Sequence, residues 1–307
     1  MHNMLYNYDI KEVSDYNCSQ KRGKKMKKII SLILALALIT CGAFTFTSCG
    51  DDKIYVQTNA FFAPFEYYDG SKIVGVDVEI MELVGKELGK EVVWTDGDFG
   101  IIIDLVSEGK TADCGAAGIT VTPERADKVD FSDTYFTSIQ YVVLDKNTDI
   151  DVKTDAQGNE YVVWESLAGM KVATQTDTTG WIYADGEIDT EGGVLYGTEG
   201  TTHTAMESAN VAAEALGTTI DAIIVDQLPA QYLTINNSSF KCYPLYYTGE
   251  DGKADEPVIE KYAIAVTKGN DELLNAINKV LAELLVKDEN GESQIDKMVM
   301  SHMGMAN

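Results

Sequence analysis

Histidine, basic residues and long hydrophobic runs are all scarce in this chain. The three histidines, His2, His203 and His302, are scattered, and no Cys-x-x-Cys motif occurs, so no metal-binding cluster is indicated. Only 24 Lys and Arg stand against 49 Asp and Glu, and the resulting net charge of -25 would repel a phosphate backbone. We therefore expect no metal, no cofactor and no nucleic-acid partner.

The most hydrophobic run, Ile29–Ile39, is shorter than the roughly 20 apolar residues that a membrane-spanning helix needs. It follows the basic stretch 21–28, which is the order found in a secretory signal. The segment Phe46-Thr47-Ser48-Cys49-Gly50 comes next and resembles the lipobox of bacterial lipoproteins, which implies a lipid on Cys49. Cys41 is a rival site, but only Cys49 is followed directly by a charged, soluble tether. We predict that residues 1–48 are an extension and a lipoprotein signal, and that the remaining chain is exported and anchored to the cell membrane.

From Lys53 onward, short apolar runs alternate with helical periodicity, which is typical of an α/β fold with a mainly parallel sheet. Lys53–Thr58 reads as the first strand, Asn59–Asp69 as a loop and Asp77–Leu88 as a helix with one apolar face. The second half repeats this order, with Ile220–Val225 as a strand and Met206 to Leu216 as a helix face. Two α/β units in series are therefore expected.

Two stretches rich in Asp, Asn and Gly, Asp145–Gly158 and Gly249–Glu256, separate these units. A strong amphipathic helix, Asn270–Leu285, follows the second stretch and is odd as an ending for the second unit. It is natural if the chain returns to complete the first unit. We expect lobe 1 over 49–144, lobe 2 over 145–248 and a return to lobe 1 over 249–307, so that two crossings form a hinge.

Ligands of open α/β sheets bind beyond the carboxyl ends of the strands, often against helix amino termini. After the expected strand Ala112–Ala116, Thr122 can cap a short helix with Pro123 at its first position. Arg125 lies in the first turn of that helix and could hold a carboxylate with its planar guanidinium. The alternative interpretation of Arg125 is an ordinary surface ion pair.

Four segments in order carry a family resemblance. They are Ala60-Phe61-Phe62-Ala63-Pro64-Phe65-Glu66-Tyr67, Val74-Gly75-Val76-Asp77-Val78-Glu79, Gly118-Ile119-Thr120-Val121-Thr122-Pro123-Glu124-Arg125 and Asp130-Phe131-Ser132-Asp133-Thr134-Tyr135. Together they resemble the bacterial extracellular amino-acid-binding proteins that serve ABC importers, from about Lys53 to the carboxyl end. The resemblance implies a two-lobed periplasmic-binding-protein fold of type II. It also implies a monomeric protein that closes on an amino acid and delivers it to a permease, without catalysis.

The resemblance also implies a ligand site. Phe62 and Phe99 would sandwich the ligand side chain, and Arg125 and Thr120 would hold its α-carboxylate. The remaining members come from both halves of the chain: the Gly118 carbonyl and Asp226 for the α-ammonium, and Thr178 and Thr179 for the carboxylate. Alternative interpretations stay open, since Asp226 could simply cap a helix and the two phenylalanines could be core residues.

Asn59 matches the position where relatives that bind cationic ligands often carry an acid, so the resemblance favours a neutral amino acid, polar or partly apolar, cystine included. Two other functions use the same fold: an exported dehydratase acting on prephenate or arogenate, and a ligand-sensing module. Of the cysteines retained after export, Cys114 and Cys242 would lie on different lobes, so we expect two buried free thiols.

Overall fold

The computed structural model describes residues 52–249 and 255–304. The predicted signal and lipidation site, including Cys41 and Cys49, lie outside the described residues. No helix within the described ranges is both long enough and apolar enough to cross a membrane.

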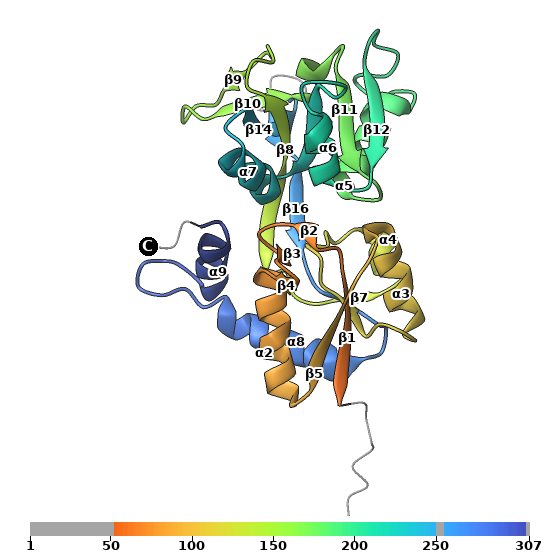
Figure 1. The fold of residues 1–307 in the computed structure, drawn as a ribbon, viewed down its shortest axis with the longest axis vertical. Helices are drawn as coiled ribbons and strands as arrows, with labels where there is room; N and C mark the ends of the chain where they lie inside the picture. The colour runs from red at the N-terminus through yellow and green to blue at the C-terminus, as the bar shows by residue number, and fades with distance from the viewer. Residues whose placement is uncertain (1–51, 250–254, 305–307) are drawn as a thin grey trace, which may run out of the picture. The chain divides into compact units, whose positions relative to one another are not determined.

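The first lobe is built on a five-stranded sheet of order β5-β1-β6-β17-β7 (Figure 1). Its strands are β1 (Lys53–Thr58), β5 (Glu91–Asp96), β6 (Cys114–Gly115), β7 (Asp130–Phe131) and β17 (Ala265–Val266). β1 is parallel to β5 and β6, whereas β17 is antiparallel to β6 and β7. The helices of this lobe are α2 (Val76–Leu88), α3 (Ile102–Glu108), α4 (Pro123–Ala126), α8 (Asp271–Leu284) and α9 (Gln294–His302), with a 3-10 turn η1 (Phe99–Ile101).

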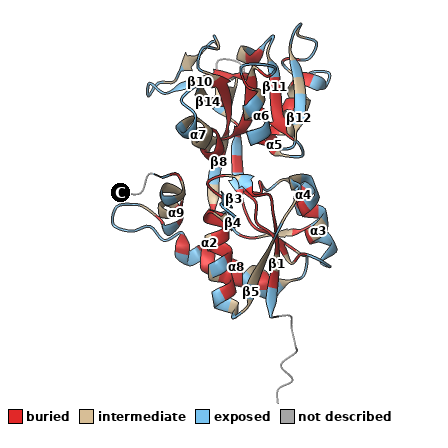
Figure 2. Ribbon diagram, in the orientation of Figure 1, coloured by how far each residue is buried: buried red, intermediate tan, exposed pale blue. Residues whose placement is uncertain are grey.

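The second lobe is built on a nine-stranded mixed sheet with the path β12-β11-β13-β8-β14-β10-β9. The path strands are β8 (Phe136–Asp145), β9 (Lys153–Thr154), β10 (Glu160–Val163), β11 (Lys171–Gln175), β12 (Thr202–Met206), β13 (Ala222–Asp226) and β14 (Phe240–Tyr247); β15 (Glu256–Pro257) pairs with β14, and β16 (Ile259–Tyr262) with β8. Its helical segments are η2 (Trp164–Leu167), α5 (Thr179–Ala184), η3 (Asp185–Asp189), α6 (Ala209–Ala215) and α7 (Gln227–Asn236). Figure 2 shows buried residues on β8 and β11 of the second lobe and on helices α2 and α8 of the first.

Two antiparallel strands connect the lobes. The first half of β8 pairs with β16, and its second half, from Gln140, pairs with β13 in the second lobe (Figure 1). The chain then returns through β16 to β17 of the first sheet. The division at 144/145 and 248/249 stays a prediction, while the strand register puts the change of pairing partner inside β8, and the return to the first sheet between β16 and β17. The predicted boundaries lie in turns, because turns are recognisable from their content of Asp, Asn and Gly. A strand that changes its pairing partner along its length has no such turn, so the sequence does not reveal the change.

Two local predictions were wrong. Residues 59–69, expected as a loop, contain β2 (Phe61–Phe62) and β3 (Glu66–Asp69), which form a small sheet with β4 (Lys72–Val74). Met206 is the last residue of β12 rather than part of a helix. Ser208 explains the difference, because its hydroxyl accepts from the Val211 N–H at 3.2 Å and starts α6 at Ala209.

The two retained cysteines are free thiols, one in each lobe, as predicted. Cys114 is buried in β6, but Cys242 in β14 is only half-buried, which corrects the expectation that both are buried.

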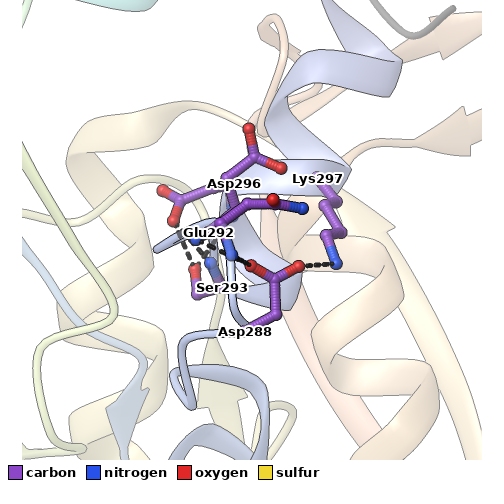
Figure 3. Close-up of polar contacts among 6 residues, drawn as sticks. Asp288, Glu292, Ser293, Asp296 and Lys297 are labelled. Atoms are coloured by element: carbon purple, nitrogen blue, oxygen red, sulfur yellow. Dashed lines mark hydrogen bonds and ion pairs between the residues drawn. The ribbon is translucent and has the colours of Figure 1, made fainter.

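The C-terminal helix α9 has a complete capping box (Figure 3). The Ser293 hydroxyl accepts from the Asp296 N–H at 3.1 Å, and the Asp296 carboxylate accepts from the Ser293 N–H at 2.8 Å. Asp288 tightens the preceding turn by accepting from the Glu292 N–H and from Lys297 Nζ at 2.6 Å. These contacts start the helix at a defined residue, far along the chain from the residues that we expect to bind ligand.

Candidate ligand-binding site

One small cavity, of about 20 Å³, is lined by all the ligand-binding residues that the sequence predicts. They are Asn59, Phe62, Phe99, Gly118, Thr120 and Arg125 from the first lobe, and Thr178, Thr179 and Asp226 from the second. Glu66, Ala117 and Gln175 complete the lining. The tertiary structure thus brings the predicted guanidinium and carboxylate to a common space, although their contacts with a ligand remain a prediction.

Arg125 is positioned by the short helix α4, which begins as the sequence predicts. Thr122 caps it by accepting from the Arg125 N–H at 3.2 Å, and Pro123 occupies the first turn. The guanidinium donates to two backbone carbonyls, Thr120 through Nη1 at 2.8 Å and Asp177 through Nη2 at 3.0 Å. No carboxylate of the described residues stands within ion-pair distance, so the surface ion-pair interpretation is wrong. A buried cation with neutral acceptors keeps its charge available for an anionic guest.

The two phenylalanines differ in their surroundings. Phe99 lies 5.2 Å from the Arg125 guanidinium carbon, with the cation over its ring. Phe62 packs against Tyr262, with ring centroids 6.2 Å apart, and so is partly a core residue. Gly118 has a φ of +52°, and a Cβ there would stand 2.6 Å from the Phe62 ring, so the wall requires glycine at this point.

The two threonines of the second lobe stand at the amino end of α5. The Thr178 hydroxyl caps α5 by accepting from the Trp181 N–H at 3.2 Å, and it donates to the Gln175 carbonyl at 2.8 Å. Its one proton is therefore committed to the protein, which weakens the prediction that Thr178 donates to a ligand carboxylate. The buried Thr179 hydroxyl faces Glu260 instead, where it lowers the pKa of that carboxyl.

Asp226 precedes α7, but its side chain does not cap the helix. It accepts from Gln140 Nε2 at 2.6 Å and from the Tyr262 hydroxyl, and it lines the cavity. The simple capping interpretation is therefore wrong. Burial raises the pKa of Asp226, and the nearby Glu260 carboxyl raises it further. The protonated form of the Asp226 carboxyl is therefore favoured, and a cation bound beside it would favour the carboxylate.

Residues 54–294 match the family described as bacterial extracellular solute-binding proteins, family 3. The chain belongs to this family. This solute-binding protein is 29% identical to the arginine-binding extracellular protein ArtP of Bacillus subtilis (strain 168) over 276 residues, which is 87% of this chain and 95% of ArtP.

Two solved structures share its two-lobed α/β fold. One is the amino acid ABC transporter substrate-binding protein AbpA of Streptococcus pneumoniae bound to L-arginine, at 26% identity and a TM-score of 0.66, covering 83% of this chain and 95% of AbpA. The other is an ancestral amino-acid-binding protein, a precursor of cyclohexadienyl dehydratase, at 25% identity and a TM-score of 0.64, covering 82% of this chain and 96% of the other.

The solute-binding protein also holds acids that sequence reasoning did not assign. Glu66 is fully buried and lines the cavity, and its carboxyl group is hydrogen-bonded to that of Asp77, while no N–H or hydroxyl donor of the described residues reaches its oxygens. Burial raises its pKa well above the ordinary value, and the neighbouring Asp77 adds to this. Burial likewise raises the pKa of Asp77 to about 6, against hydrogen bonds from the Gly118 N–H and the Tyr135 hydroxyl.

Glu260 is a further buried acid, beside Arg125 and the Asp226 carboxyl. It accepts from Gln140 Nε2 at 3.1 Å, and burial raises its pKa. A signal for Glu66 and Asp77 was present, because both lie within the motifs that carry the family resemblance. Glu260 had none, since it alternates with outward-facing residues on β16 like any half-buried strand position.

Asn59 does more than line the wall. Its Nδ2 donates to the Gly97 carbonyl, and its Oδ1 accepts from Gln175 Nε2, both at 2.9 Å. The second bond joins the first lobe to the second. The amide of Asn59 is therefore already used at both ends by the protein.

Proposed function

We propose that this solute-binding protein is the receptor of an ABC importer for a free amino acid that carries a cationic side chain, of the arginine class. The observation that carries the proposal is the charge arrangement of one cavity. Arg125 is the only cation among the described lining residues, whereas Glu66 and Asp226 are acids in the same space.

An α-amino acid matches the first part of this arrangement. Its carboxylate is suited to Arg125, and its ammonium to Asp226, whose charged form is disfavoured until a cation arrives. Both pairs gain strength in a cleft from which water is excluded. Because the two groups come from different lobes, closure depends on the guest that joins them.

Glu66 supports the choice of side chain. After the zwitterion has satisfied Arg125 and Asp226, a second acid remains in the cavity wall, and it is bonded to another buried carboxyl group, that of Asp77. Two buried carboxyl groups side by side cannot both ionise without a cation nearby, so a second cation on the ligand is a suitable partner. Relatives named as arginine-binding proteins support the same class.

The neutral ligand predicted from Asn59 is the competing proposal. The structure weakens its basis, because the Asn59 amide bonds to Gly97 and Gln175 rather than waiting for a ligand. A protonated Glu66 could still donate to a neutral amide, as in glutamine. Calorimetric titration with arginine, lysine, histidine, glutamine and cystine separates the two. Tightest binding of a neutral amino acid would overturn the cationic assignment and leave the receptor role standing.

Export and anchoring belong to the same proposal. We place the lipid on Cys49, with Cys41 as the rival, and the protein acts as a monomer outside the cytoplasmic membrane. Labelling with a fatty-acid analogue tests this: Cys49→Ser should lose the label and Cys41→Ser should keep it. Loss of label in Cys41→Ser alone would move the anchor to that cysteine. Loss of arginine uptake on deletion of the gene would link the receptor to a permease.

One relative favours a second function, since the ancestral protein described above is a dehydratase precursor. A carboxylic acid held in its protonated form is the group a dehydration would require, and Glu66 is such a group in this cavity. We propose that the protein nevertheless binds without catalysis, because Glu66, Asp226 and Arg125 are all accounted for by a dibasic ligand. Turnover of prephenate or arogenate by the purified protein would reverse this.

A further inference from the structure

Asp177 has an unusual backbone conformation. Among the described residues it is the only non-glycine with a positive φ, at 61°, a region that residues with a Cβ rarely adopt. It lies in the turn between β11 and α5 of the second lobe. A residue in a strained conformation persists only where compensating contacts hold it.

The compensating contacts reach the first lobe from both ends of Asp177. Its carbonyl accepts from Arg125 Nη2 at 3.0 Å. Its side chain lies against Gly100, where an added Cβ would stand 2.1 Å from the Asp177 Oδ2 and 3.1 Å from the Asp177 Cβ. Rotation of the carboxylate could relieve the first contact, but the second is fixed by the backbone. Gly100 follows Phe99, so both contacts are made beside the two first-lobe residues that form one wall of the ligand cavity.

The position of this contact is at the rim of the cleft. A second, outer cavity is lined by Phe99, Gly100, Arg125 and Asp177, and it shares Phe99 and Arg125 with the inner cavity. Gly100 and Asp177 are exposed, while Arg125 is buried. The pair therefore lies on the solvent side of the guanidinium, where the lobes must separate before a ligand can leave.

Resting on the proposed function, we infer that Gly100 and Asp177 form a matched closing pair. Asp177 is a positioning residue: it holds the Arg125 guanidinium from the second lobe and fastens the lobes together. Gly100 is needed because its missing Cβ is the space that the Asp177 carboxylate fills. Since neither residue lines the inner cavity, the pair acts on the lifetime of the closed state and not on the choice of ligand.

The test is Gly100→Ala, with Gly97→Ala as the matched control, because a Cβ on Gly97 meets nothing within 4 Å. We expect Gly100→Ala to raise the dissociation rate by about tenfold, since contacts made on closure act mainly on dissociation. The same factor should apply to every amino acid that binds. The double variant Gly100→Ala/Asp177→Gly should recover most of the loss, because removing the carboxylate frees the space.

Small-angle scattering of the ligand-free proteins gives a readout that does not depend on the ligand. Gly100→Ala should have a larger radius of gyration than wild type and Gly97→Ala, and the double variant should return toward wild type. Equal behaviour of Gly100→Ala and Gly97→Ala in scattering would overturn the pair, as would failure of the double variant to recover. Failure of any amino acid to bind the wild type would instead overturn the proposed function.

Discussion

The two ends of the ligand cavity handle buried charge in opposite ways. At one end the Arg125 cation is bonded to two neutral carbonyls, of Thr120 and Asp177, so its charge is solvated but not cancelled. At the other end, burial raises the pKa of Asp226 and of Glu66, and their protonated forms are favoured. Arg125 is therefore charged before the ligand arrives, whereas the acids become anions when a cationic ligand binds.

Removing the prepared cation should have the largest effect. We expect Arg125→Ala to weaken binding by about 2 to 5 kcal/mol, since the variant loses a buried charge-assisted contact. Calorimetry measures the loss. Lys128→Ala is the control, because this exposed lysine lies one turn further on and pairs with Asp104 at 2.9 Å. Equal affinities of Arg125→Ala and wild type would exclude Arg125 from the site.

The acidic end should show selectivity. Glu66→Gln keeps the size of the side chain but cannot become an anion, so arginine should bind about 10- to 100-fold more weakly while glutamine changes little. Glu82→Gln, at an exposed position of α2, serves as control. An equal loss of affinity for arginine and for glutamine would mean that Glu66 supports the fold and does not distinguish the ligand side chains.

The release of protons on ligand binding tests the same difference between Arg125 and the buried acids. If a cationic ligand turns buried carboxylic acids into carboxylates, binding releases protons to the buffer. Titrations of arginine at neutral pH in buffers of different ionisation enthalpy should therefore give different apparent binding enthalpies. Glu66→Gln should reduce that dependence. Identical enthalpies in all buffers would contradict ionisation on binding.

A pH effect on the ligand-free protein tests Asp226 together with Glu260, whose nearby carboxyl contributes to the raised pKa of Asp226. Because its pKa is raised by folding, the folded state keeps a proton that the unfolded chain has lost, so its contribution to stability falls as pH rises above the ordinary carboxyl range. Relative to wild type, Asp226→Asn should gain a few °C in Tm on going from about pH 5 to about pH 8. The exposed Glu191→Gln should show no such trend, and a pH-independent difference for Asp226→Asn would contradict the raised pKa.

The smallest effect should come from a site far from the cavity. Ser293→Ala removes the cap of α9 and should lower stability by about 1 kcal/mol, since one helix N–H loses its partner. Ligand affinity should not change. A weaker affinity would show that the C-terminal helix is coupled to the cleft.

The sequence by itself determined the two α/β units and most of the cavity lining. These predictions rest on local patterns, which can be recognised from the sequence alone. They are the hydrophobic periodicity, the Thr122 cap and the motif around Gly118 to Arg125. Whether Asp226 caps a helix or faces a ligand could not be read that way, because both roles place an acid at the same point of the chain.

Only the tertiary structure decided which acids share the cavity and which residues close it. Glu66 and Asp77 were visible in motifs but became a pair only through the contact of β3 with α2, and Glu260 joined Asp226 through the antiparallel register of β8 and β16. Gly100 and Asp177 meet across the cleft, although nothing in the sequence around either residue indicates this contact. Burial and the pKa values that follow from it depend on neighbours from distant parts of the chain, and a linear sequence does not contain those distances.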